Sequence, residues 1–390
     1  MLIKMNPKRI ISIDAYRGFV MLALVIGNTW VFRQLAKEFP NNKHWAFLSD
    51  QFSHVPWNGV SFWDLIQPSF LFLAGLSIPF SYSKRIERGQ TITDLLGHAI
   101  YRSIVLILLG LYISSPFEHF KNIHFNNILV QIGLTYIFAF LVVKNNPPTQ
   151  LGIALGILTI CWGAFALYPL SDHGLEYSTG STQVNILHFS GFFAHWNIDT
   201  NLAASFDQWF LNLFPREQPY RPSIGETYTI NFIPSVANMI FGLTAGEFLR
   251  TNKSQLRAFK YIAGSGFICI LLGLLLGQML CPIVKSIWTP SWAIYSTGWS
   301  LCLFSCFFWL IDVKGKRRWT FPLVVVGMNS ITIYCMSMTG GWWFLKYWKL
   351  FLGEGMFDGT DGLIWSAFAV VFSLWLVCVI LHRIRLFIRI

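Results

Sequence analysis

The stretch from residue 363 to residue 382, LIWSAFAVVFSLWLVCVILH, determines the class of fold. It contains no Asp, Glu, Lys or Arg, and a transmembrane helix needs about 20 mostly apolar residues to cross a hydrocarbon core of roughly 30 Å. Its apolar residues do not alternate with polar ones, as they would in a strand of a membrane β-barrel. We therefore expect a membrane-spanning α-helix here.

Nine other stretches have similar length and composition. The chain is thus expected to be all-α, a polytopic integral membrane helical bundle of about ten transmembrane helices. The ten predicted spans cover residues 12–32, 62–82, 98–116, 125–143, 149–168, 229–249, 260–280, 291–311, 320–338 and 363–382.

The overall composition agrees with a membrane protein. Of the 390 residues, 54% are hydrophobic and only 12% are charged, which leaves too little polar surface for a water-soluble enzyme of this size. The net charge of +11 comes from short basic clusters between apolar runs, so membrane topology explains it better than nucleic-acid binding. The seven Cys lie in or beside apolar runs without zinc-ligand spacing, so we expect free thiols and no metal site.

Basic residues also predict the orientation. If the N-terminus is cytosolic, the cytosolic segments hold 18 Lys and Arg and the opposite side holds 9, which favours cytosolic positions for both termini. Residues 339–352 are an alternative eleventh span. They are short, basic and rich in Trp, however, and suit a helix lying in the membrane interface better.

Two connecting segments are long enough to contribute to a site, residues 33–61 and residues 169–228. Both are expected on the extracytoplasmic side. With no linker or low-complexity tract between the spans, residues 1–390 are expected to form a single transmembrane domain.

The first predicted span carries polar residues at both ends. Asp14 and Arg17 are three residues apart and are expected to pair on one helical face. They form either a structural ion pair at the interface or a cytosolic site for an anionic cofactor. Asn28, near the outer end, serves either in helix packing or in catalysis.

The segment SHVPWNGVSFWDLIQPSF, residues 53–70, combines a His with polar residues at a membrane boundary. A neutral His54 would be able to accept a proton or an acyl group. Asp64 lies close in sequence and is expected to orient it. We take His54, Asp64 and Asn28 as the candidate catalytic residues, with Trp57 and Asn58 of the same loop as candidate substrate contacts.

Further polar residues suggest a lined cavity and an acceptor site. Gln131, Asn329 and Ser330 lie within later spans, where they would line a polar cavity and bind cofactor, or merely join helices. In the 169–228 segment, carboxylates, amides and indoles suit sugar binding through hydroxyl hydrogen bonds and ring contacts; the alternative is an ordinary solvated cap. The candidate substrate residues there are Asp199, Asn201 and Asp207.

Ordered motifs in this chain resemble those of the heparan-α-glucosaminide N-acetyltransferase family, which consists of multi-span acyltransferases. The resemblance extends from about residue 10 to about residue 340. Its motifs are SIDAYRG at 12–18, HVPWNG at 54–59 and DLIQPSF at 64–70, with weaker matches QIGLTY at 131–136, KSIWT at 285–289 and GMNS at 327–330. The chain departs from the family where Ile132, not Arg, follows Gln131.

The resemblance implies acetyl transfer across a membrane. Acetyl-CoA would be the cytosolic co-substrate, and an amine or hydroxyl of an extracytoplasmic sugar or glycan would be the acceptor. His54 matches the family's catalytic His, and Asn28 matches an Asn placed beside it. The resemblance also implies a protein of the bacterial cytoplasmic membrane and a homodimer.

A multi-span transporter of a solute or lipid-linked intermediate is the alternative function, since polar residues inside a bundle also suit a transport path. Transporters usually show internal repeats and broken helices in matching positions. Neither is expected from this sequence, which favours the enzyme.

Overall fold

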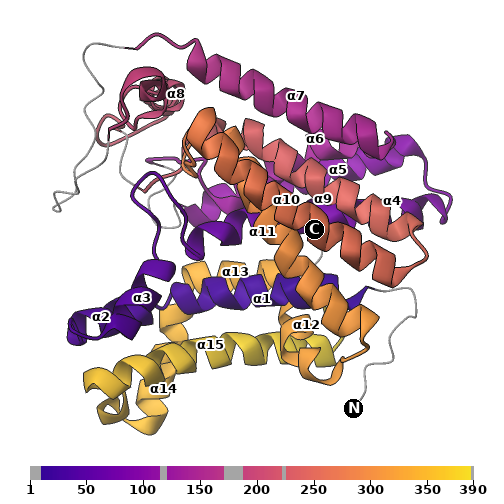
Figure 1. Ribbon diagram of the computed structural model, residues 1–390. Coiled ribbons are helices and arrows are strands. Elements are labelled where there is room, and N and C mark those ends of the chain that lie inside the picture. Colours follow the sequence, from indigo (N-terminus) through magenta and orange to yellow (C-terminus); the bar gives the residue numbers. More distant parts are fainter. Residues whose placement is uncertain (1–9, 115–120, 171–187, 222–224, 388–390) are drawn as a thin grey trace. The chain divides into compact units, whose positions relative to one another are not determined.

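The computed structural model describes residues 10–114, 121–170, 188–221 and 225–387, and these residues form helices joined by loops (Figure 1). No β-strand occurs among them. Their one isolated β-bridge joins Asn58 to Val284. The prediction of an all-α protein is confirmed for this part of the chain.

Seven helices are long and apolar enough to cross a membrane, and each coincides with a predicted span. Three of them include a short helical turn at one end: η1 (Trp63–Leu65) before α4, η3 (Thr229–Asn231) before α9, and a π-helical turn (Trp309–Val313) after α11. The seven are α4 (Ile66–Ile86), α5 (Ile92–Ser114), α7 (Pro147–Ala166), α9 (Phe232–Thr251), α10 (Gln255–Met279), α11 (Pro290–Phe308) and α15 (Gly359–Arg383).

Two predicted spans are broken, contrary to the expectation of unbroken helices. The first consists of α1 (Ile11–Gly27) and α2 (Val31–Glu38), bent by 43°. The ninth consists of α12 (Phe321–Met328) and α13 (Ser330–Thr339), bent by 68°. With each pair counted as one span, the total rises to nine.

The remaining predicted span is a shorter helix, α6 (Ile128–Leu141), of 14 residues. At 1.5 Å per residue it is about 21 Å long, less than the hydrocarbon thickness. The structure therefore supports seven to nine spans, and the count of ten stays a prediction.

The two long connecting segments contain short helices. α3 (Lys43–Gln51) belongs to the 33–61 segment, while η2 (Gly191–Trp196) and α8 (Leu202–Leu211) belong to the 169–228 segment, of which residues 171–187 and 222–224 lie outside the described residues. The proposed interface segment, residues 339–352, forms α14 (Gly341–Leu352), and η6 (Glu354–Phe357) follows it.

Backbone packing divides the chain into two compact units. The first comprises residues 1–52, 252–264 and 301–389, and the second comprises residues 53–251 and 265–300 with residue 390. The units are interleaved along the sequence. Our expectation of a single domain over residues 1–390 remains a prediction.

The second unit is built around α4 and α9, which bury far more of their length than α5 or α7. Glycines allow the close approach of these two helices. A Cβ at Gly75 would overlap the backbone carbonyl of Met239, and one at Gly242 would overlap that of Phe72. Small residues at such crossings are typical of membrane helix pairs, whose association depends on close packing.

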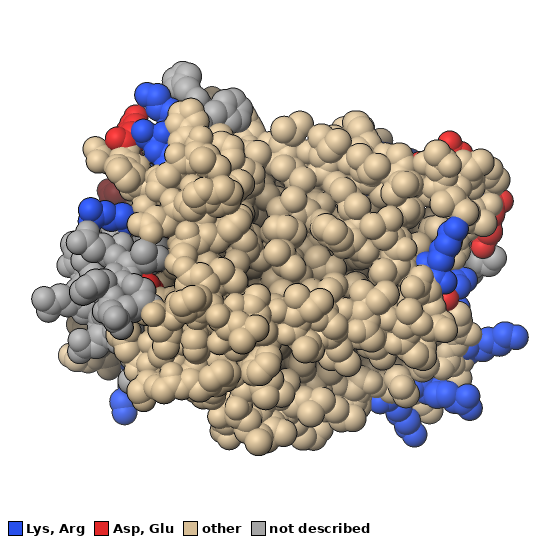
Figure 2. Space-filling view, turned by 90° about the horizontal axis from the view of Figure 1, so that it is seen from above, with Lys and Arg blue, Asp and Glu red and all other residues tan. Residues whose placement is uncertain are grey.

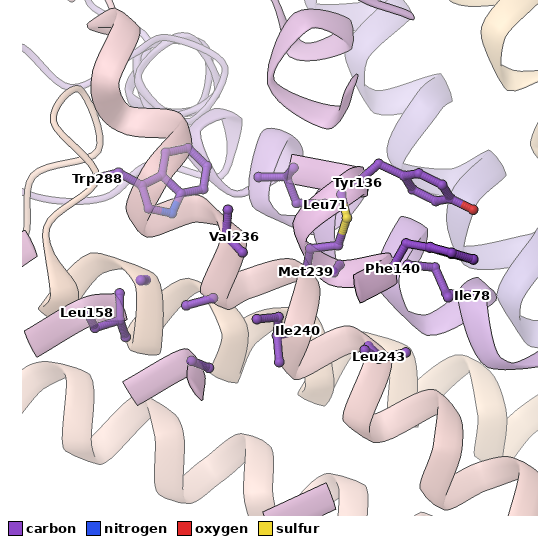
Figure 3. Close-up of a cluster of buried hydrophobic side chains, with 14 of the residues drawn as sticks. Leu71, Ile78, Tyr136, Phe140, Leu158, Val236, Met239, Ile240, Leu243 and Trp288 are labelled. Atoms are coloured by element: carbon purple, nitrogen blue, oxygen red, sulfur yellow. The ribbon is translucent and has the colours of Figure 1, made fainter. Parts of the chain in front are cut away.

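The core of this unit takes buried side chains from α4, α5, α6, α7, α9 and α11, and Trp288 joins them from the α10–α11 loop (Figure 3). Leu71 and Ile78 come from α4, Tyr136 and Phe140 from α6, Leu158 from α7, and Val236, Met239, Ile240 and Leu243 from α9.

In the first unit, α1 packs on α12 with an equally close approach, since a Cβ at Gly18 would overlap the carbonyl of Leu323. Asp312 caps α1. Its carboxylate accepts hydrogen bonds from the N–H groups of Ile11 (3.3 Å) and Ser12 (3.1 Å), which are otherwise unsatisfied at a helix start.

The surface charge and the state of the cysteines are the last two features of the fold. In the view of Figure 2, uncharged residues make up most of the surface of the described residues. All seven Cys belong to the described residues and are free thiols, as expected.

Candidate active site

His54 lies in a loop that leads from α3 into η1 and α4, and neighbouring segments fix this loop. The indole N–H of Trp57 donates to the carbonyl of Trp196 (2.9 Å), and the Trp57 side chain is buried. Gly59 donates its N–H to the carbonyl of Ile283 (3.1 Å). Its φ of 123° is a conformation that favours glycine.

Three ionisable groups meet at this loop. The Nδ1 atom of His54 lies 2.6 Å from Oδ1 of Asp64, and Nζ of Lys285 lies 3.1 Å from the same Nδ1. Lys285 also donates to Oδ1 of Asp64 at 3.2 Å. Lys285 comes from the α10–α11 loop, so the cluster joins segments more than 200 residues apart in sequence.

The loop itself holds the Asp64 carboxylate. Its Oδ2 atom accepts from the N–H groups of Val55 (3.3 Å) and Ser61 (3.3 Å) and lies 2.9 Å from the Ser61 hydroxyl. The Asp64 side chain is 1% exposed, whereas that of His54 is 42% exposed. The cluster therefore presents a fixed, buried carboxylate behind an accessible imidazole.

Hydrogen bonding assigns the tautomer of His54. The indole N–H of Trp63 lies 3.2 Å from Nε2 of His54, and because an indole only donates, Nε2 must be the acceptor. Nδ1 then carries the proton and donates to Asp64. In this tautomer the Nε2 lone pair is the basic and nucleophilic site of the ring.

Electrostatics favour the neutral imidazole. Partial burial and the positive charge of Lys285 lower the pKa of His54 below its ordinary value, and Asp64 opposes both effects. Burial likewise lowers the pKa of Lys285, while Asp64 raises it. With His54 neutral, the charges of Lys285 and Asp64 balance, so a neutral base stands beside a compensated ion pair.

A line of amides extends from this cluster into the bundle. Gln67 on α4 donates to Gln131 on α6 (2.5 Å), and Gln131 donates to Asn231 at the start of α9 (3.2 Å). Asn231 donates to the carbonyl of Ser286 (3.5 Å), next to Lys285. We call these residues, Gln67, Gln131, Asn231 and Ser286, the amide line.

Gln131 is thus buried with both ends of its amide hydrogen-bonded. Its predicted cofactor role remains a prediction, and the observed bonds show that it joins α4, α6 and α9.

The other predicted cofactor residues belong to the first unit. Asp14 and Arg17 form the expected i,i+3 ion pair, 3.5 Å between Oδ1 and Nη1. Asn329 and Ser330 stand at the break between α12 and α13, where the fully buried Asn329 donates to the carbonyl of Val325. Their cofactor-binding role stays a prediction.

Asn28 also belongs to the first unit and follows the last residue of α1. Its amide lies 3.6 Å from the sulfur of Met338. Its partnership with His54 stays a prediction.

The predicted substrate residues have varied surroundings. Trp57 is buried as described, and Asn58 next to it is exposed. Asn201 caps α8 by accepting from the N–H of Ala204 (2.9 Å). Asp199 lies 3.6 Å from His188. Trp57 and Asn201 are therefore used in local structure, while Asn58 is accessible.

Asp207 is the most unusual of this set. It is 1% exposed, its Oδ2 accepts from the N–H of Thr229 (2.8 Å), and its Oδ1 has no hydrogen-bond partner among the described residues. Burial raises its pKa to about 7. Asp207 is thus a buried carboxyl that titrates near neutrality.

Sequence reasoning gave Lys285 no role at the site, although this residue begins the KSIWT match at 285–289 and is one of the predicted extracytoplasmic bases. One signal was present: a single Lys between two apolar runs, flanked by Pro282 and Pro290. A carboxylate at a span boundary needs a partner, and Lys285 is the basic residue of this short loop.

The fold and the site together define a polytopic helical membrane protein with a His–Asp–Lys cluster at the start of a span. Comparison with known proteins gives the family. The catalytic model of heparan-α-glucosaminide N-acetyltransferase matches residues 9–283, well over half of the chain, and the chain belongs to that family.

Two curated relatives are both called heparan-α-glucosaminide N-acetyltransferase. The human protein is 25% identical over 383 residues, covering 88% of this chain and 55% of its own length. The mouse protein is 25% identical over 394 residues, covering 88% and 56%. The chain thus spans about half the length of these relatives. His54 and Asp64 lie inside the matched family region, and Lys285 lies just beyond it.

Proposed function

We propose that this protein transfers an acetyl group from cytosolic acetyl-CoA to an amine or hydroxyl of an extracytoplasmic sugar or glycan. The observation that carries the proposal is the His54–Asp64–Lys285 cluster in a chain of this acetyltransferase family. Both termini in the cytosol, a bacterial cytoplasmic membrane and a homodimer belong to the same proposal.

His54 is the proposed catalytic residue, acting through Nε2. In direct transfer, Nε2 takes the proton of the acceptor while the acceptor attacks the thioester carbonyl; the new C–N or C–O bond forms, the C–S bond breaks, and the proton passes to the CoA thiolate. In the two-step route, Nε2 attacks the thioester carbonyl, the C–S bond breaks and CoA leaves as a thiolate; the acceptor then attacks the acetyl-imidazole, the bond to Nε2 breaks, and the acceptor's proton passes to the thiolate. Asn28 is the proposed hydrogen-bond donor to the developing oxyanion.

Asp64 and Lys285 are the proposed positioning residues. Asp64 keeps the proton on Nδ1 and stabilises the imidazolium that forms when Nε2 takes a proton. Lys285 compensates the buried carboxylate and favours the neutral imidazole before reaction. Trp63 must release Nε2 before a substrate reaches it, since the lone pair accepts only one strong donor.

The amide line supports an approach of the acetyl donor, acetyl-CoA, from inside the bundle. It links α4, α6 and α9 to the residue next to Lys285 through successive hydrogen bonds. Exposed Asn58 and half-buried Asp199 are the proposed acceptor contacts. Buried Asn201 and Asp207 are proposed to support the acceptor site through the local structure that they stabilise.

The test is acetyl transfer from labelled acetyl-CoA to glucosamine by the purified protein in detergent. His54→Ala should lower the rate at least about 10²-fold, because general-base catalysis contributes roughly 10² to 10⁴. His44→Ala, which removes an exposed His from neighbouring α3, should retain the wild-type rate. Full activity of His54→Ala would remove the mechanism.

The broken helices favour transport as a second candidate, because transporters build substrate sites from discontinuous helices. Both bent pairs lie in the first unit, and among the described residues the second unit has none. Thermal stabilisation separates the candidates: acetyl-CoA or CoA should stabilise the enzyme, whereas stabilisation by a solute alone would indicate transport.

A further inference from the structure

A second group of ionisable residues lies in the second unit, at the opposite end of α4 from Asp64. Arg85 is in the last turn of α4, about 20 residues and roughly 30 Å of helix beyond Asp64. Its Nη2 lies 2.7 Å from Nε2 of His98 on α5. Because a guanidinium only donates, His98 accepts through Nε2.

Arg102 extends this group further along α5. It follows His98 by four residues and so shares its helix face. Its guanidinium carbon lies 4.5 Å from the ring centroid of Tyr136 on α6, and its Nε atom is buried without a hydrogen-bond partner among the described residues. The Tyr136 ring therefore fixes the position of the guanidinium, while its Nε–H remains to be satisfied.

No acidic residue balances these charges in the part of the chain that the structure describes. The ion pairs found there involve other residues. Asp94, one turn before His98, caps the start of α5 instead, accepting from the N–H (2.9 Å) and hydroxyl (2.6 Å) of Thr91. Arg102 lies within a candidate span, where an uncompensated positive charge is costly, and Arg85 adds a second positive charge at the neighbouring end of α4.

We propose that Arg85, His98 and Arg102 form a binding site for a phosphate group. Guanidinium forks suit phosphate oxygens through paired, charge-assisted hydrogen bonds. Two sources have this chemistry, the phosphates of CoA and the headgroup of an anionic phospholipid. The CoA arm of the proposal rests on the proposed function.

The geometry connects this site with the amide line. Tyr136, which contacts Arg102, lies five residues after Gln131 on α6, a rise of about 7.5 Å. The proposed phosphate site and the amide line therefore share α6. This arrangement fits a donor with a phosphate at one end and a reactive group at the other.

The experiment compares Arg85→Gln and Arg102→Gln with Arg88→Gln, which removes an equal charge from an exposed position just after α4. CoA affinity is measured in phosphatidylcholine nanodiscs. Retained phosphatidylglycerol is counted by native mass spectrometry after reconstitution in mixed nanodiscs. Unfolding temperatures establish that each variant is folded, and Arg85→Lys and Arg102→Lys keep the charge if a Gln variant does not fold.

If the phosphate belongs to CoA, both Gln variants should bind CoA about tenfold more weakly or worse, since a hydrogen bond to a charged group is worth about 1.5 to 3 kcal/mol. If it belongs to a lipid, they should lose bound phosphatidylglycerol and keep their CoA affinity. Arg88→Gln should match wild type in both assays. Unchanged affinity and unchanged lipid retention in both Gln variants would overturn the site.

Failure of the proposed function gives a different result. A wild-type protein that binds no CoA and transfers no acetyl group would refute the enzyme, while the phosphatidylglycerol arm would still decide the phosphate site.

Discussion

The two ring nitrogens of His54 have different partners: Nδ1 is hydrogen-bonded to the buried carboxylate of Asp64, and Nε2 accepts from the indole N–H of Trp63. This division of roles matters because a neutral His can act as a base or nucleophile only through its unprotonated nitrogen. Asp64 sets the tautomer, and Lys285 limits how readily the ring becomes charged. The protonation state of His54 therefore depends on both Asp64 and Lys285.

The pH dependence of acetyl transfer should report on Lys285. Wild type needs neutral His54, so its rate should fall only as the pH drops through a pKa that burial and Lys285 hold below the usual 6.5. In Lys285→Met the positive charge is lost, so that pKa rises and the acidic limb of the rate profile should move to higher pH. The measurement is kcat/KM against pH.

Lys144→Met, an exposed Lys in the turn before α7, is the matched control and should keep the wild-type profile. Lys285→Met should also lower stability by about 3 to 5 kcal/mol, since it leaves Asp64 buried without its cation. Asp64→Asn combined with Lys285→Met should recover part of that loss. An acidic limb that stays in place in folded Lys285→Met would contradict the role of Lys285.

The sequence predicted part of this site for a physical reason. His54 and Asp64 are ten residues apart in one motif, so a single loop was expected to bring them together, and the structure places them at 2.6 Å. Lys285 lies 221 residues from Asp64, and only the packing of the α10–α11 loop against the His54 loop brings it near. No local pattern records such a contact.

Among the elements, the α4–α9 pair should be highly sensitive to added volume. Gly242→Ala should destabilise the protein by about 1 to 3 kcal/mol, because the new methyl group would overlap the Phe72 carbonyl and force the helices apart. Gly156→Ala on α7, where a Cβ meets no atom within 4 Å, is the control. Thermal unfolding in detergent measures both, and equal stability of the two variants would contradict this packing.

Helix positions followed from hydropathy, whereas helix breaks did not. Residues 12–32 were expected to form an unbroken span because hydropathy registers side chains and not backbone angles. α1 instead ends at Gly27, and Trp30 adopts a left-handed conformation, with φ 58°, before α2. The sequence predicts a span over residues 125–143. In the structure α6 begins after its N-cap Asn127 and ends at Leu141, so it has only 14 residues.

At the scale of the whole molecule, the proposed function requires acetyl-CoA and the sugar acceptor to reach His54 from opposite sides of a membrane. The chain has seven to nine candidate membrane spans. In the second unit, hydrogen bonds join the amide line to the residue next to Lys285, and the proposed phosphate site shares α6 with that line through Tyr136. An assay in detergent cannot test sidedness, so this claim needs a sealed bilayer.

The decisive measurement uses proteoliposomes with labelled acetyl-CoA enclosed and glucosamine supplied either outside or enclosed with it. We predict N-acetylglucosamine only when the two substrates are on opposite sides, with no product from His54→Ala. Product formed equally well with both substrates enclosed together, or only in that arrangement, would contradict transfer across the membrane.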